Sequence, residues 1–113
     1  MTTTDTWHRV AKLVDLEEEY PTPVKIGNRE VALCLVDGTV FAVDNICSHA
    51  FAHLSDGHLE EFEIMCPLHG GSFDVRTGIP IRAPCFTPVV AHECRIENDQ
   101  VFIKIGPEPA ANE

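Results

Sequence analysis

Two short stretches of the chain each place a cysteine close to a histidine. Cys47 and His49 stand two positions apart, and Cys66 and His69 stand three positions apart. Thiolate and imidazole are the side chains that bind zinc and iron–sulfur clusters in proteins. Two short loops that each offer two ligands can assemble a metal centre at a low entropic cost. The spacing therefore predicts one metal site with four protein ligands.

The order of these residues along the chain favours an iron–sulfur cluster over zinc. Structural zinc sites usually draw two cysteines from one motif and two histidines from another. Here each motif mixes the two types, which suits a [2Fe–2S] cluster with two cysteines on one iron and two histidines on the other. Gly70 and Gly71 follow the second pair, and glycine lets backbone N–H groups approach sulfur closely. A structural zinc-binding module stays open as an alternative.

The elements that must position these residues are predicted to be β-strands. Short apolar runs rich in β-branched residues alternate with turn residues, a pattern typical of antiparallel hairpins. The predicted strands are 23–26, 31–36, 40–43, 89–96 and 100–105, with residues 7–16 as a strand and then a loop. Between them, residues 44–88 are dense in Gly, Pro, His and Cys and form an insertion with strand-like pieces, EFEIMC and SFDV. The tail 106–113 is predicted to be disordered.

Composition limits the classes of partner and location. A length of 113 residues is that of one domain, 1–113. The formal net charge of −10 disfavours binding to nucleic acid and to anionic membranes. No apolar run is long enough to span a bilayer, and the N-terminus carries no secretory pattern, so we expect a cytoplasmic protein. Five cysteines, an odd number, argue against a disulfide framework.

The segment from Cys47 to Gly78 resembles the cluster-binding segment of Rieske ferredoxins. The likeness is to the ferredoxin components of bacterial aromatic-ring-hydroxylating dioxygenase systems. It rests on LSDG (54–57), CPLHGG (66–71) and FDVRTG (73–78). APCFTP (83–88) resembles the loop that shields the cluster in this family, with Pro84 as its key residue.

This resemblance implies both a fold and a ligand set. The fold would be all-β, with antiparallel sheets forming an incomplete barrel and a small cluster-binding subdomain at about 44–88. One [2Fe–2S] cluster would be bound, with Cys47 and Cys66 on the inner iron and His49 and His69 on the outer iron.

The resemblance implies an electron carrier and not an enzyme. The chain would pass single electrons from a flavin-dependent ferredoxin reductase to a terminal Rieske non-haem iron oxygenase. A Rieske-type small subunit of an assimilatory nitrite reductase is an alternative. The chain is expected to be a monomer that docks transiently through the residues around the cluster. These are His49, His69, Phe51, Leu68 and Pro84.

Three positions bear on the reduction potential. Ala52 and Leu68 stand where high-potential relatives carry the two cysteines of a disulfide, and Gly71 stands where they carry a serine. Fewer hydrogen-bond donors stabilise the reduced cluster less, so we predict a potential at the low end of the range of roughly −150 to +300 mV. Ser72, one position on, is the residue that could raise it.

Other residues of chemical interest are given plainer roles. Cys34 and Cys94 lie in apolar strand patterns and are predicted to be buried free thiols, and Cys85 is predicted to be inert. His53 and His58 are expected at the surface or beside the ligands.

His8 and His92 show no constellation in the sequence. The acidic group Glu60, Glu61 and Glu63 is expected to be a solvated turn, with steering of a basic partner as the alternative.

Overall fold

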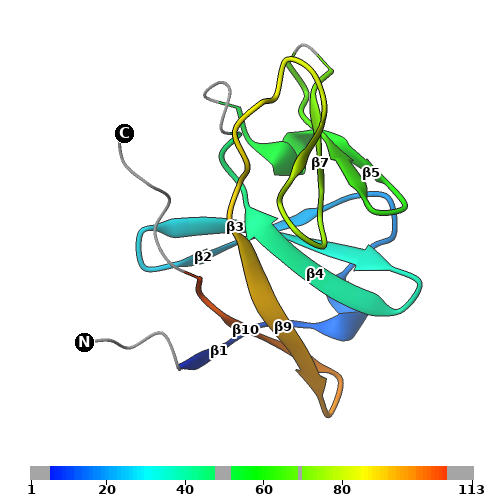
Figure 1. Ribbon diagram of the computed structural model, residues 1–113. Helices are drawn as coiled ribbons and strands as arrows, with labels where there is room; N and C mark the ends of the chain where they lie inside the picture. The colour runs from blue at the N-terminus through cyan, green and yellow to red at the C-terminus, as the bar shows by residue number, and fades with distance from the viewer. Residues whose placement is uncertain (1–5, 48–51, 69, 107–113) are drawn as a thin grey trace.

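The computed structural model describes residues 6–47, 52–68 and 70–106, and these form two antiparallel sheets (Figure 1). The strands of the large sheet are β1 (Trp7–Lys12), β2 (Thr22–Ile26), β3 (Arg29–Val36), β4 (Thr39–Asp44), β9 (Ala91–Glu97) and β10 (Gln100–Lys104). Those of the small sheet are β5 (His58–Glu60), β6 (Glu63–Met65), β7 (Ser72–Asp74) and β8 (Pro80–Arg82). Two single 3₁₀ turns are η1 (Leu13–Asp15) and η2 (Leu54–Asp56). No helix within the described ranges is long and apolar enough to cross a membrane.

The large sheet curls into an incomplete barrel. Its strand order is β1-β10-β9-β4-β3-β2, and the two outer strands, β1 and β2, contact each other. The β3–β4 hairpin turns at Asp37 and Gly38, whose φ angles of 51° and 82° are those that a tight hairpin turn requires. The β9–β10 hairpin turns in the same way at Asn98 and Asp99. Both predicted hairpins, and the all-β fold, are confirmed.

Strand β3 is buried on both of its faces. Val31 and Leu33 point into one core, inside the barrel, where they pack with Val101 and Ile103. Its alternate residues, such as Cys34, belong to a second core on the other side of the sheet. A strand covered on both faces reads as a continuous apolar run, which explains why VALCLV shows no alternation.

The small sheet covers this second core. Leu59, Ile64 and Phe73 are fully buried against the outer face of the β3–β4 hairpin, and Figure 1 shows the small sheet standing over that hairpin. The rings of Phe41 in β4 and Phe62 in the β5–β6 turn meet edge to face at 5.7 Å. The second core therefore joins the small sheet, which carries one cysteine loop, to the barrel, which leads into the other.

Some strands and burial states differ from the prediction. The sequence does not predict β5 and β8, because strands of three residues with one buried position in β5 and none in β8 show no period that a sequence can reveal. The last predicted hairpin begins at Ala91, two residues later than expected, since Val89 donates its N–H to Gly78 O of the β7–β8 turn instead of joining the sheet. Cys34 is buried as predicted, but Cys94 is only half-buried, because it lies at the margin of the barrel core.

The prediction that His92 has no constellation is wrong. Its imidazole is enclosed between β9, β4 and Gly106, which follows β10, and its Nε2 atom lies 2.9 Å from Oδ1 of Asp44. Arg29 in β3 also binds Asp44, at 3.1 Å. His92 and Arg29 lie 48 and 15 residues from Asp44 in the sequence, so no local sequence motif indicates that the three interact.

Candidate metal centre

Two loops of equal length each begin with a cysteine. The N–H of Cys47 donates to Ala52 O at 2.9 Å, and the N–H of Cys66 donates to Gly71 O at 2.7 Å. Antiparallel pairing also flanks each loop. Ile46 pairs with His53 beside the first loop, and β6 pairs with β7 beside the second. We call these the first loop (47–52) and the second loop (66–71). Each predicted ligand motif thus begins at a cysteine that is held by the same kind of backbone hydrogen bond.

The two cysteines meet inside the molecule. The thiols of Cys47 and Cys66 form no disulfide, and both are buried and in hydrogen-bonding contact with each other. The predicted partners His49 and His69 lie within the two loops, and both fall outside the described residues, as does Phe51. Within the described residues no group of three or more His, Cys, Asp and Glu side chains has the geometry of a metal site.

The surroundings of this thiol pair fit an iron–sulfur cluster. Burial raises the pKa of the Cys66 thiol, while a hydrogen bond from the N–H of Leu68 acts in the opposite direction by stabilising negative charge on sulfur. Two buried soft donors, one of them facing a backbone N–H, are what one iron of a [2Fe–2S] cluster needs. The donor set and its packing therefore suit the cluster that the sequence predicts.

Asn45 holds the base of the first loop, and the sequence prediction missed it. It is buried, and its own N–H donates to Glu30 O in β3. Its backbone carbonyl and side-chain Oδ1 accept the N–H groups of Leu54 and Ser55, each at 2.7 Å. An asparagine between a buried strand and a ligand loop is a usable signal, because its amide commonly satisfies backbone N–H groups in turns.

Glu63 holds the base of the second loop, and the expectation that it is solvated is wrong. Its side chain is 18% exposed and accepts hydrogen bonds from Oγ of Ser72 in β7 and Nε of Arg82 in β8. These two donors hold the pKa of the Glu63 carboxyl below its ordinary value. Ser72, considered as a donor to the cluster, directs its hydroxyl to Glu63 instead.

A third loop (83–88), which follows β8, supplies another buried thiol to this region. Cys85 is 4% exposed, and its thiol contacts that of Cys47. Burial, followed by the two neighbouring cysteines, raises its pKa to about 12. Pro84 is half-buried beside it. Two apolar side chains near the loops remain open to solvent, Leu68 at 44% and Phe86 at 77%.

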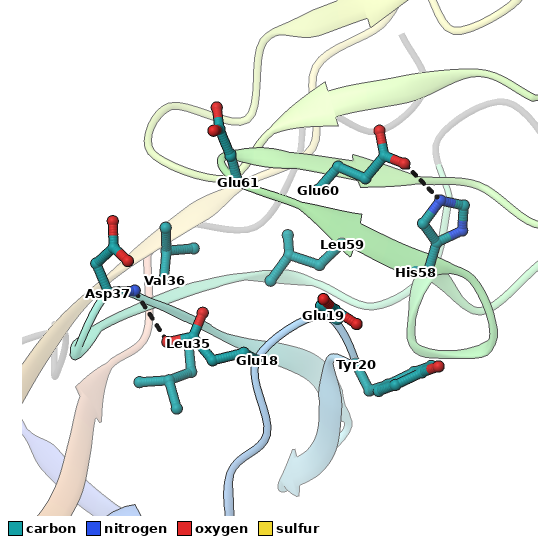
Figure 2. A pocket seen from close by; sticks show the side chains of 10 residues that line it. All are labelled: Glu18, Glu19, Tyr20, Leu35, Val36, Asp37, His58, Leu59, Glu60 and Glu61. Atoms are coloured by element: carbon teal, nitrogen blue, oxygen red, sulfur yellow. Dashed lines mark hydrogen bonds and ion pairs between the residues drawn. The ribbon is translucent and has the colours of Figure 1, made fainter.

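A groove lies on another part of the surface. It has a volume of about 540 Å³ and lies between the segment Glu18–Tyr20, the β3–β4 turn and the β5–β6 turn. Figure 2 shows carboxylates of Glu18, Glu19, Asp37, Glu60 and Glu61 around it. Among the described residues of the three loops, none lines this groove. Glu60 and Glu61 are therefore exposed as expected, and they belong to an acidic surface separate from the thiol pair.

Comparison with known proteins agrees with this geometry. Residues 6–99 match the family model of the Rieske [2Fe-2S] domain, which covers most of the chain and all of the residues described above as the site. The chain belongs to the Rieske family. Its cofactor is therefore one [2Fe–2S] cluster of the Rieske type, and the choice between iron–sulfur and zinc is decided for the former.

Relatives of this Rieske chain are electron-transfer proteins. The ferredoxin component of the naphthalene 1,2-dioxygenase/salicylate 5-hydroxylase systems of a Ralstonia species is 41% identical over 102 residues, which cover 90% of this chain and 98% of the relative. The ferredoxin of carbazole 1,9a-dioxygenase from Nocardioides aromaticivorans superposes with a TM-score of 0.84 at 39% identity, covering 88% and 97%. The prediction of a ferredoxin and not an enzyme is confirmed.

Two further structures bear on partners. A ferredoxin solved in complex with the oxygenase of carbazole 1,9a-dioxygenase is 31% identical, with a TM-score of 0.82, and the match covers 87% of this Rieske chain and 92% of that one. A putative nitrite reductase small subunit is 21% identical, with a TM-score of 0.75, over 87% and 97%. At that identity the second likeness concerns the fold alone.

Proposed function

We propose that this chain carries single electrons from a flavin-dependent ferredoxin reductase to a terminal Rieske non-haem iron oxygenase that hydroxylates aromatic rings. The observation that supports this most directly is the pair of buried thiols, Cys47 and Cys66, at the start of two matched loops. In this proposal His49 and His69 complete the ligand set, within a single domain that spans residues 1–113 and acts in the cytoplasm. The cluster, when bound, supplies one-electron redox chemistry.

The protein part of the function is to hold and insulate the two thiolates. The hydrogen bonds that close each loop fix the cysteines before metal binds, which lowers the entropic cost of assembling the site. Burial of both sulfur atoms excludes water, and the N–H of Leu68 stabilises negative charge on Cys66. Neither the first nor the second loop carries a described titratable side chain beyond these cysteines.

Docking in this proposal uses the apolar side chains around the loops. Leu68 and Pro84 join His49, His69 and Phe51 in the predicted contact surface. Phe86, which the prediction did not include, adds an exposed ring next to the buried Cys85. The net charge of −10 favours encounter with a partner that presents basic residues. The rate of association falls with added salt when charge steers the encounter, whereas it does not fall when apolar contacts alone govern association.

The first experiment is a metal and spectroscopic analysis of the purified protein. We expect two irons and two sulfides per chain, a brown colour and, after reduction, the low average g value of a histidine-ligated cluster. Cys66→Ser should abolish these signals, and the matched control Cys94→Ser should keep them, since Cys94 lies at the margin of the barrel core. A colourless protein that holds zinc would contradict the proposal.

The second experiment tests the electron path. The reduced ferredoxin is mixed with a terminal aromatic-ring oxygenase, and the rate of cluster reoxidation is followed by absorbance at increasing ionic strength. We expect a rate that falls with salt and a midpoint potential at the low end of the Rieske range. Reoxidation that is no faster with the oxygenase than without it would contradict the assignment of partner. A midpoint potential well above zero would contradict the predicted low reduction potential.

A further inference from the structure

The three loops bring a third thiol against the cysteine pair. Cys85 lies within the same core as Cys47 and Cys66, and its sulfur is in hydrogen-bonding contact with the sulfur of Cys47. Its backbone N–H donates to Arg82 O at 3.2 Å, which fixes the start of the third loop against β8. The thiol is thus held in place by main chain on one side and by Cys47 on the other.

Gly71 provides the room that this thiol needs. A Cβ atom at Gly71 would overlap Sγ of Cys85 and lie 3.2 Å from the backbone nitrogen of Cys85. Its neighbour Gly70 differs, because it has a φ of +75° with open space around it. Gly70 is therefore glycine for its backbone conformation and Gly71 for close approach. The sulfur of Cys85 fills the volume that a side chain at position 71 would take.

The direction of the hydrogen bond follows from what Cys47 must do in the proposed site. A cysteine that binds iron has lost its proton and can only accept a hydrogen bond. The contact between the two sulfur atoms persists in the loaded protein only if Cys85 supplies the hydrogen. Hydrogen bonds to ligand sulfur stabilise the more negative, reduced cluster and raise its potential.

We propose that Cys85 is a positioning residue of the cluster site, which seats its sulfur against Gly71 and donates an S–H hydrogen bond to the sulfur of Cys47, thereby raising the reduction potential. Cys85 is not a fifth ligand in this inference, and it is not inert. The inference rests on the proposed function, because it concerns the cluster that Cys47 binds.

The donor role is tested by the midpoint potential of the loaded protein. Cys85→Ala should keep the full iron and sulfide content and the g values of the wild type but shift the potential downwards. Cys85→Ser, which keeps a donor of similar size, should stay at or above the wild-type potential. Cys94→Ala, which removes a half-buried thiol outside this core, is the control and should cause no shift.

An opposite result has a distinct physical meaning. If Cys85 only fills space, its removal admits water to the site, and the added polarity stabilises the reduced cluster. Cys85→Ala would then raise the potential or leave it unchanged, and the donor role would be overturned. Failure of the proposed function looks different, because the wild type and Cys94→Ala would then also lack iron, sulfide and the reduced-state signal.

The contact between Gly71 and Cys85 is tested by two substitutions, made singly and together, with the melting temperature and the iron content per chain as the measured quantities. Gly71→Ala should lower both quantities, because the added methyl group overlaps the Cys85 sulfur. Gly71→Ala combined with Cys85→Ala should recover much of the loss. If Gly71→Ala lowered the melting temperature equally in the wild type and in Cys85→Ala, the proposed contact would be overturned. This outcome does not depend on which cofactor the protein binds.

Discussion

The backbone N–H of Gly106 donates a hydrogen bond of 2.8 Å to Nδ1 of His92. Because a backbone N–H can only donate, Nδ1 is the acceptor, and the proton of the neutral ring is on Nε2. Nε2 can then donate to Asp44, and Arg29 bonds both to Asp44 and, at 3.2 Å, to the carbonyl oxygen of Gly106. The end of the barrel sequence is thereby tied to β4, the strand that leads into the first loop.

Replacement of His92 should weaken the whole barrel. His92→Ala leaves the N–H of Gly106 without its acceptor and takes a donor from Asp44 in a buried setting. Loss of one partner of a buried hydrogen bond costs about 1–3 kcal/mol. We expect the free energy of unfolding, measured with urea, to fall by that amount. The control is His58→Ala, whose imidazole is half exposed in β5, and a fall of equal size there would contradict the assignment.

The Glu63 carboxyl should make the free energy of unfolding depend on pH. Its carboxyl has a folded-state pKa below the ordinary value of 4.5, because Arg82 and Ser72 donate to the ionised form. The unfolded chain therefore takes up this proton more readily than the folded chain. The stabilisation is complete above about pH 4.5 and is lost as the pH falls through the folded pKa.

Glu63→Gln should therefore be less stable than the wild type at neutral pH, and the difference should shrink as the pH falls below that value. Urea unfolding between neutral pH and pH 3 measures it. Glu60→Gln, at an exposed position in the same hairpin, is the matched control. A difference between Glu63→Gln and the wild type that stays constant over this range would refute the linkage.

The parts of the fold that the sequence predicts are those set by neighbouring residues. The β3–β4 hairpin follows from apolar runs on both sides of Asp37 and Gly38, and the structure turns there. The strands β5 and β8 escape prediction, because their positions depend on packing against β6 and β7 and not on their own composition.

The same distinction separates the parts of the site. Cys47 and Cys66 could be singled out because each has a histidine within three positions. Cys85 carries no such neighbour, and only the folded chain brings it to Gly71. The partners of His92 and Glu63 also lie far away along the chain, so the sequence shows no constellation for His92 and indicates only a solvated turn for Glu63.

Asn45 should be needed for the geometry of the first loop as well as for stability. Asn45→Ala deprives the partly buried N–H of Ser55 of its acceptor, and the loss of a partner costs up to about 1–3 kcal/mol. Since the base of the loop would loosen, we expect iron to be lost faster to a chelator. Asn28→Ala, at an exposed turn position, should change neither quantity. Unchanged iron release from Asn45→Ala would show that the loop closes without this side chain.

Alanine substitutions at Gly78 and Gly38 distinguish the free-energy cost of a left-handed backbone conformation from the cost of a steric overlap. Their φ angles are nearly the same, +83° and +82°, so alanine at either position suffers the left-handed penalty of about 1–2 kcal/mol. Gly38 has open space around it, whereas a Cβ at Gly78 would overlap the carbonyl oxygen of Val89. Gly78→Ala must therefore also displace the segment that joins the third loop to β9.

We expect Gly38→Ala to lower the free energy of unfolding by the conformational penalty alone and Gly78→Ala to lower it by at least about 2 kcal/mol more. Urea unfolding of both variants measures the difference directly, because the shared φ term cancels. The displaced segment carries the N–H of Val89 away from Gly78 O, so hydrogen exchange at Val89 should also quicken in Gly78→Ala. Equal losses in the two variants would mean that the β7–β8 turn yields without strain and does not hold the third loop in position.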